Sequence, residues 1–422
     1  MSAASTTPHT PLRPLLGAQL VFNTGFYAVV PFLAVVLRDD FALGGAAVGL
    51  VLGLRTFAQQ GMFLAGGLLV DRLGARTLVV LGCAVRTVGF ALLAVPGDLW
   101  LFVVGVVATG LGGALFSPAL ETLVAHADRA RTGRSTAFAL LSVVGETGAV
   151  LGPLLGAALL GWGFAAVAGT GALVFAVTGV VLAVVLRGVP QARRPARAST
   201  GSRRLPPAPL VLLAAVCSVN LLAYNQLYLG LPYELERVGL GTGALAGLFA
   251  LASVLTVAGQ LPLARLARRV GTPRAVRAGY VVMATGFLVL AVAAPLAAPG
   301  PAWLPVTVAV VLLTAGHLLV TPTTLEAVGR LAPAGALGAS YGLMATAGGV
   351  AVLVGNTGLG LLYPAAAASG PGAGAVWTVL AVLPLLPALV APRVLRTAPT
   401  SDHTPDPDPA PDPAPDHQET HR

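Results

Sequence analysis

The chain has 422 residues, of which 56% are hydrophobic and only 10% are charged. Soluble domains carry about 25% charged residues, so this composition excludes an ordinary soluble domain. The formal net charge of +9 comes from arginine alone, because the sequence contains no lysine. These arginines gather in predicted loops on one side of a membrane, which argues against a role in binding nucleic acid.

Twelve apolar stretches are long enough to cross a bilayer, which takes roughly 20 residues per helix. Backbone groups must be hydrogen-bonded within lipid, so each stretch is expected to be a helix. In chain order the predicted spans are 14–37, 46–70, 77–95, 99–125, 135–160, 164–187, 209–232, 242–264, 274–294, 303–328, 338–363 and 374–391. The sequence therefore predicts an all-α polytopic membrane protein with twelve transmembrane helices.

Three segments without an apolar run divide the chain. Residues 1–13 are polar and predict a cytoplasmic N-terminus rather than a cleaved signal peptide. Residues 188–208 are rich in Arg, Pro and Ser, and predict a cytoplasmic linker between six-helix halves at 14–187 and 209–391. Residues 392–422 contain repeated Pro-Asp pairs and predict a disordered cytoplasmic tail.

Arginine is distributed unevenly between the two sides of this predicted bundle. The segments assigned to the cytoplasm hold almost all of it, whereas the opposite loops hold only Arg38 and Arg237. Cytoplasmic loops of multi-pass membrane proteins carry such an excess of basic residues. The pattern predicts a protein of the cell membrane with both termini in the cytoplasm.

The two halves repeat one another at a constant spacing of 197 residues. The matching pairs are Asn23 with Asn220, Tyr27 with Tyr224, Gly74 with Gly271, Gly82 with Gly279, Gly89 with Gly286, and Phe90 with Phe287. A run of matches at one spacing predicts a duplicated six-helix unit. Duplicated units of this kind are typical of secondary transporters.

The residues 67–76 lie between the second and third predicted spans and read Gly-Leu-Leu-Val-Asp-Arg-Leu-Gly-Ala-Arg. The pattern G-x-L-x-D-R-x-G-x-R resembles the loop signature that the major facilitator superfamily carries at this position. The resemblance implies two parallel six-helix repeats that rock about a site near the membrane midplane. The copy in the second half is degraded, because Arg268 stands where Asp71 stands.

This loop is expected to act as a gate. Gly74 permits a tight turn, and Gly67 is expected to permit close approach of two helices. Asp71, with Arg72 and Arg76 beside it, can dock against a neighbouring helix end, where the helix dipole attracts a carboxylate. In the family that the loop resembles, this docking stabilises one state of the transport cycle. The alternative is that the arginines only set the topology.

A second motif lies in the predicted fifth helix. Gly148, Gly152, Pro153 and Gly156 fit the pattern G-x-x-x-G-P-x-x-G-[GA], in which glycines four residues apart form a flat packing surface. Proline can kink the helix, because it lacks a backbone N–H. The motif resembles the helix-5 signature of proton-driven drug exporters within the superfamily. The alternative is an ordinary glycine seam.

The resemblance is closer over residues 53–118, where the sequence is similar to the MdtH-type bacterial multidrug transporters. The matching residues are Gly53-Leu54-Arg55, Phe57, Gln59-Gln60-Gly61, Arg86, Gly89-Phe90, Gly110-Leu111-Gly112-Gly113, Phe116 and Pro118. One position departs from many drug exporters, which carry an arginine in helix 4 where this chain has Val106. Proton coupling would therefore have to use other residues.

Three ionisable residues lie well inside predicted spans, namely Arg55, Arg86 and Glu146. A charge at the bilayer centre costs about 2.5–3.5 kcal/mol, so these side chains should face the bundle interior. Glu146 is the candidate proton carrier, because a buried carboxyl gains or loses its proton as its surroundings change. Arg55 and Arg86 are its candidate partners, or else contact an anionic substrate. The alternative for all three is a static ion pair.

Other polar and aromatic residues are expected to line a substrate cavity, since helices 1 and 7 line the central path in the family that this chain resembles. The candidates are Asn23, Tyr27, Gln59, Asn220, Tyr224, Asn225, Gln226, Tyr228 and His317. A few polar groups in a mainly apolar pocket suit varied amphipathic ligands. Each candidate is otherwise an interhelical hydrogen-bond partner.

The sequence therefore predicts a secondary transporter that exports small hydrophobic or amphipathic compounds in exchange for protons. An uptake symporter for a small metabolite is the alternative, and a non-transporting sensor is disfavoured because no segment supplies an output domain. No nucleotide loop, metal-ligand cluster or nucleophile motif is recognised, so neither an enzyme nor a cofactor or metal is expected. We expect a monomer in the lipid bilayer.

Overall fold

The computed structural model describes residues 12–127, 134–187, 206–296, 303–333, 336–364 and 371–397. The predicted N-terminal segment 1–13, linker 188–208 and tail 392–422 lie largely outside these residues. Throughout the described part the regular structure is helical, without strands. Eleven helices in it are long and apolar enough to cross a membrane. They coincide with every predicted span except the second, 46–70, which is interrupted.

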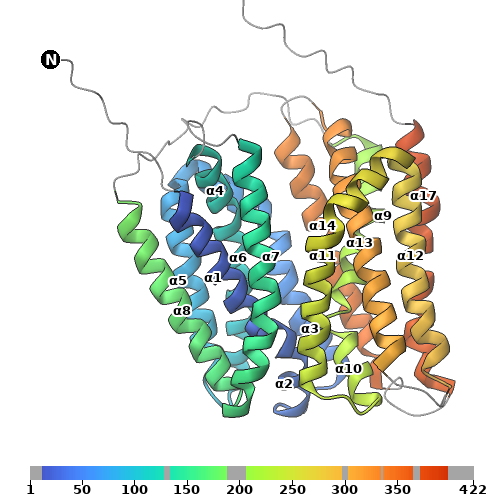
Figure 1. The fold of residues 1–422 in the computed structure, drawn as a ribbon, viewed down its shortest axis with the longest axis horizontal. Coiled ribbons are helices and arrows are strands. Elements are labelled where there is room, and N and C mark those ends of the chain that lie inside the picture. The colour runs from blue at the N-terminus through green and yellow to red at the C-terminus, as the bar shows by residue number, and fades with distance from the viewer. Residues whose placement is uncertain are drawn as a thin grey trace, which may run out of the picture.

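The first half of the chain forms the helices of one bundle, and the second half forms those of the other (Figure 1). The first comprises α1 Leu12–Val29, η1 Val30–Phe32, α2 Leu33–Asp39, α3 Gly45–Thr56, η2 Phe57–Gly61, α4 Phe63–Leu73, α5 Ala75–Leu93, α6 Leu99–Ala127, α7 Arg134–Leu159, η3 Leu160–Trp162 and α8 Phe164–Val185. The second comprises α9 Ala208–Asn225, α10 Gly230–Arg237, α11 Thr242–Val270, α12 Thr272–Ala293, α13 Trp303–Leu331, α14 Leu337–Gly360, η4 Pro371–Gly374, α16 Ala375–Val382 and α17 Leu385–Thr397.

The second predicted span is broken by a π-helical segment. Helix α3 passes into η2, which consists of the five residues Phe57–Gly61. At the next residue, Met62, the backbone leaves the helical region at φ −93° and ψ 3°. Helix α4 then completes the crossing. Single π-helical turns inside α-helices are frequent at functional sites, and this one carries Gln59 and Gln60.

The duplicated sequence produces duplicated geometry. Gly74 joins α4 to α5 at φ 85° and ψ 145°, and Gly271 joins α11 to α12 at φ 85° and ψ 148°. Residues with a side chain rarely adopt a positive φ, so each turn depends on glycine. We call the end of the molecule that carries these two turns the Gly74 end, and the opposite end, where α2 finishes, the Arg38 end.

The two halves touch closely towards the Arg38 end, where α3 packs against α14. A methyl group on Gly49 would overlap the carbonyl oxygen of Asn356, and one on Gly45 would overlap that of Gly360. A methyl group on Gly53 would lie 2.8 Å from the Cα atom of Leu353. The glycine stripe of α3 therefore brings the two backbones into direct contact. Helices α7 and α11 form the other main contact between the halves.

Candidate functional site

A cavity of about 740 Å³ lies between the halves, on the Gly74 side of the α3–α14 contact. We call it the central cavity. Its walls include the predicted residues Tyr27, Arg55, Gln59, Asn220, Tyr224, Asn225, Tyr228 and His317. Further wall residues, among them Phe63, Glu121, Leu325 and Tyr341, lie nearer the Gly74 end. The cavity therefore extends from the middle of the bundle towards that end.

Two predicted cavity residues lie elsewhere. The side-chain amide of Asn23 donates a hydrogen bond of 2.8 Å to the carbonyl oxygen of Gly145 in α7, so this residue joins two helices. Gln226 is buried in a polar network near the Arg38 end, where its amide donates to the Asn356 side chain over 2.9 Å. The expectation that these two residues line the cavity is therefore corrected. Each forms an interhelical hydrogen bond instead, which was the stated alternative.

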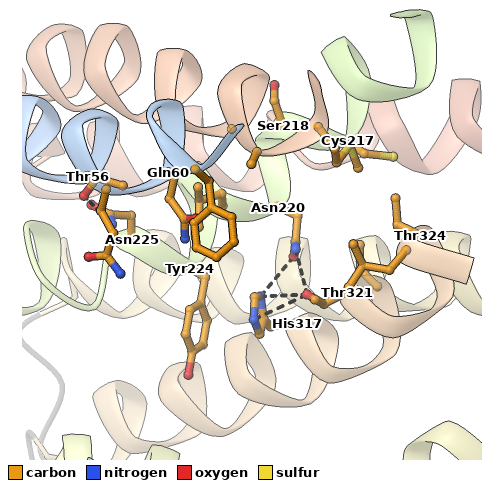
Figure 2. A pocket seen from close by; sticks show the side chains of 18 of the residues that line it. Thr56, Gln60, Cys217, Ser218, Asn220, Tyr224, Asn225, His317, Thr321 and Thr324 are labelled. Carbon is orange, nitrogen blue, oxygen red and sulfur yellow. Dashed lines mark hydrogen bonds between the residues drawn. The ribbon is translucent and has the colours of Figure 1, made fainter. Parts of the chain in front are cut away.

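His317 forms a compact cluster on the second-half wall of the cavity (Figure 2). Its ring stacks on Tyr224 with centroids 4.0 Å apart. Nδ1 lies 3.3 Å from the Asn220 side-chain oxygen, and Nε2 lies 3.3 Å from the Thr321 hydroxyl. A neutral imidazole with its proton on Nδ1 satisfies both contacts, since it donates to the amide oxygen and accepts from the hydroxyl.

Arg55 and Arg86 lie together in the first half. Arg55 is 5% exposed, and its Nη2 donates to the Oε1 atom of Gln59 over 2.7 Å. Arg86 is fully buried, with its guanidinium carbon 3.8 Å from the ring centroid of Phe22 and 4.9 Å from that of Phe26. Contacts of this kind contribute up to about 2 kcal/mol when desolvated. They offset part of the cost of about 2.5–3.5 kcal/mol for placing each charge in the membrane.

Glu146 lies half-buried in α7, in a second cavity of about 360 Å³ between α7 and α11. We call it the side cavity. It shares Tyr27, Tyr224 and His317 with the central cavity, and α11 adds Ser253, Thr256 and Gln260 to its wall. Among the described residues, neither Arg55 nor Arg86 lies within 4.0 Å of the Glu146 carboxylate. The static ion pair between them is therefore not formed in this state.

The glycines of the helix-5 motif pack α7 against α1. A methyl group on Gly148 would lie 2.7 Å from the carbonyl oxygen of Leu20, and one on Gly152 would lie 2.6 Å from Cβ of Tyr27. One on Gly156 would overlap the carbonyl oxygen of Ala28. Helix α7 continues through Pro153 to Leu159. The motif is thus a glycine seam, and it fixes Tyr27 beside the helix that carries Glu146.

The predicted gate lies at the Gly74 end, but the side chain of Asp71 lies outside the described residues. Arg72 is exposed, and Arg76 donates a hydrogen bond of 2.8 Å to the carbonyl oxygen of Arg187. The close approach expected at Gly67 occurs at Gly66 instead. A methyl group on Gly66 would overlap the Ala114 carbonyl oxygen, whereas no described atom would lie within 4 Å of one on Gly67.

An ion pair connects the halves at the Arg38 end. Arg38 at the end of α2 contacts the carboxylates of Asp39 and of Glu236 in α10. Nearby, the buried carboxylate of Glu234 accepts hydrogen bonds from Arg237 and from the indole N–H of Trp377. These contacts and the α3–α14 contact close the Arg38 end in this state.

A buried polar network runs from this closed end to the cavity. The Tyr363 hydroxyl donates to Gln226 over 2.7 Å, and Asn356 donates to the Asn225 side-chain oxygen over 2.8 Å. The Asn225 amide lies 3.4 Å from the Thr56 hydroxyl of α3, so the network crosses between the halves (Figure 2). Asn225 also lines the central cavity.

Comparison with known proteins identifies the family. The model of the Major Facilitator Superfamily matches residues 15–356. The chain belongs to the major facilitator superfamily. It is 36% identical over 375 residues to an uncharacterized MFS-type transporter of Mycobacterium tuberculosis, with 84% of this chain and 86% of the relative covered. It is also 33% identical over 272 residues to the multidrug resistance protein MdtH of Cronobacter sakazakii, with 64% and 67% covered.

Solved structures of transporters share the fold. An auto-inhibited peptide transporter of the POT family superposes with a TM-score of 0.79, covering 93% of this chain and 98% of that one. The POT family transporter PepTSo superposes with a TM-score of 0.77. The sequences are 16% and 15% identical, so these likenesses concern the fold alone. The chain is therefore a multi-pass membrane transporter for a small molecule, and not an enzyme.

Several site residues were not predicted from the sequence. Ser253, Thr256 and Gln260 line the side cavity opposite Glu146. Their spacing places them on one face of a helix, which is a signal that the sequence does contain. Thr321 was not among the predicted site residues, yet it bonds to both Asn220 and His317. In the described part of the chain, no group of three or more His, Cys, Asp and Glu residues is placed to hold a metal ion.

Proposed function

We propose that this transporter exports small hydrophobic or amphipathic compounds in exchange for protons. The observation that carries the proposal is the central cavity, whose walls combine aromatic rings with a few polar groups. Such pockets bury apolar ligands and orient them through a small number of polar contacts. The relatives named multidrug resistance protein MdtH support export of this class of compound.

The distribution of arginine assigns the Gly74 end to the cytoplasm in this proposal. Arg72, Arg76, Arg268 and Arg330 lie at that end, whereas Arg38 and Arg237 lie at the other. The structure then corresponds to a state whose cavity extends towards the cytoplasm and whose outer end is closed. Both termini are cytoplasmic, and one chain suffices because the cavity forms between its own halves.

Glu146 carries the proton in this mechanism. Its carboxyl faces polar groups of α11 across the contact between the halves, so rocking of the halves changes its surroundings. A carboxyl that is desolvated in one state and hydrated in the other takes up a proton on one side and releases it on the other. Tyr27, Tyr224 and His317 connect its cavity to the substrate cavity.

Expression in an exporter-deficient host tests the direction of transport. We expect lower accumulation of at least one lipophilic dye or antibiotic, and we expect a protonophore to abolish the difference. The matched control is the Glu146→Gln variant at equal abundance in the membrane. Accumulation that rises with expression and depends on protons would instead identify an uptake symporter.

The loop at the Gly74 end acts as a gate in this proposal, and Asp71→Asn tests it. Because Asp71 lies at a helix end, we expect insertion and folding to be retained. We expect a several-fold slower transport rate, since the loss of a carboxylate near a helix end removes roughly 0.3–1 kcal/mol from one state. Transport at the normal rate and normal abundance would leave Asp71 without a gating role. Arg72→Gln is the companion variant for the adjacent charge.

A further inference from the structure

Arg55 is a charged residue in the wall of the central cavity, and none of the described residues forms an ion pair with it. It lies in the last turn of α3, directly before the π-helical segment, and it is 5% exposed. Its hydrogen bond runs to the neutral amide of Gln59, and its Nε has no hydrogen-bond acceptor among the described residues. Its guanidinium carbon lies 4.5 Å from the ring centroid of Phe26.

Arg86 is a second buried positive charge close to Arg55, on the side of Arg55 away from the cavity. All three of its guanidinium nitrogens lack a hydrogen-bond acceptor in the described part of the chain. Phe26 contacts both guanidinium groups, at 4.5 Å for Arg55 and 4.9 Å for Arg86. A methyl group on Gly113 would touch both Nη2 of Arg86 and the side chain of Gln59, at 2.6 Å and 3.2 Å. The two charges therefore flank the same glutamine.

No carboxylate of the described residues compensates these charges. The four ion pairs found there involve Arg38, Arg237 and Arg330, all at the ends of helices. Glu121 lines the central cavity and Glu146 the side cavity, yet neither lies within 4.0 Å of Arg55 or Arg86. The cavity wall around Arg55 is therefore positive, while the other polar groups of the cavity, apart from Glu121 nearer the Gly74 end, are amides, hydroxyls, a thiol and an imidazole.

We propose that Arg55 is an anion subsite of the central cavity and that its ligands are amphipathic compounds bearing one carboxylate. Arg55 lines the cavity, and a guanidinium presents a planar fork of donors that matches a carboxylate. Arg86 reinforces the positive potential from behind. The apolar body of the ligand packs against Phe26, Tyr27 and Tyr224, in a volume that suits a small molecule. This inference rests on the proposed function, because it names the substrate class of the same cavity.

Equilibrium binding to the purified full-length protein in lipid nanodiscs tests the subsite. The probes are 2-naphthylacetate, its uncharged amide and the cationic (2-naphthylmethyl)trimethylammonium, which share one ring system. For the unmodified protein we expect the carboxylate to bind about tenfold tighter than the amide or more, as the loss of a charged hydrogen bond predicts. The cation should bind most weakly. Equal affinity for all three probes would overturn the proposal without any variant.

Two variants locate the effect. Arg55→Gln should remove the preference for the carboxylate while it leaves binding of the amide unchanged, and Arg55→Lys should restore part of the preference. Arg396→Gln, on an exposed part of α17, is the matched control and should keep the full preference. A preference that survives in folded Arg55→Gln protein overturns the assignment. Efflux of neutral lipophilic dyes is measured separately, so loss of the subsite and loss of the export function are distinguishable.

Discussion

Glu146→Gln is expected to abolish accumulation against a gradient while substrate binding is retained. Glutamine preserves the size and most hydrogen bonding of the side chain but has no proton to release. The variant should therefore fall to the level of protein-free vesicles in proton-driven transport. Counterflow exchange requires no net proton movement and should continue at a substantial fraction of the normal rate. Both rates are measured in proteoliposomes and normalised to folded protein.

Glu121→Gln is the matched control, because Glu121 is a carboxylate that lines the central cavity but not the side cavity in which Glu146 lies. It should retain proton-driven accumulation. If the Glu146→Gln variant coupled transport to protons as well as the unmodified protein does, Glu146 would not be the proton carrier. Reduced abundance with unchanged coupling per folded molecule would instead identify a purely structural carboxylate.

Hydropathy predicted the helices well because lipid leaves the backbone few alternatives. It did not predict where the helices break, since the π-helical segment at Phe57–Gly61 falls within one continuous apolar run. The bounds of the remaining spans were predicted to within a few residues in most cases, as at 99–125 for α6 Leu99–Ala127. The π-helical segment packs against α14 and α6, which are remote in sequence, so these neighbours could not be read from the hydropathy of the span.

The internal repeat predicted the cavity only in part. Asn23 and Asn220 are equivalent in the sequence, yet Asn220 lines the cavity and Asn23 bonds to the backbone of α7. The difference arises because the glycines of α7 bring that helix against α1, within reach of Asn23. Equivalent positions thus acquire different neighbours, which the repeat alone does not encode. The sequence also did not show which of the adjacent glycines Gly66 and Gly67 approaches α6, because this depends on the rotation of α4 about its axis.

Gly49→Val is expected to open the Arg38 end and to stop the transport cycle. Even a methyl group at Gly49 overlaps the carbonyl oxygen of Asn356, so α3 cannot keep its present contact with α14. Overpacking of a close contact costs typically about 1–3 kcal/mol, which shifts a two-state equilibrium by roughly 5-fold to 150-fold. The neighbouring link from Asn225 to Thr56 should weaken together with the contact.

Spin labels on Asp40 and Gly243, at the Arg38 end of each half, report the change as a longer distance between the labels. The labelled cysteines are introduced after Cys83 and Cys217 are replaced by alanine. Gly44→Val is the matched control, because Gly44 is exposed, has extended backbone angles of φ −65° and ψ 155°, and has no described atom within 4 Å of an added methyl group. If Gly49→Val does not fold, Gly45→Val tests the same contact one turn away. Unchanged label distances in folded protein would show that the α3–α14 contact does not hold this end closed.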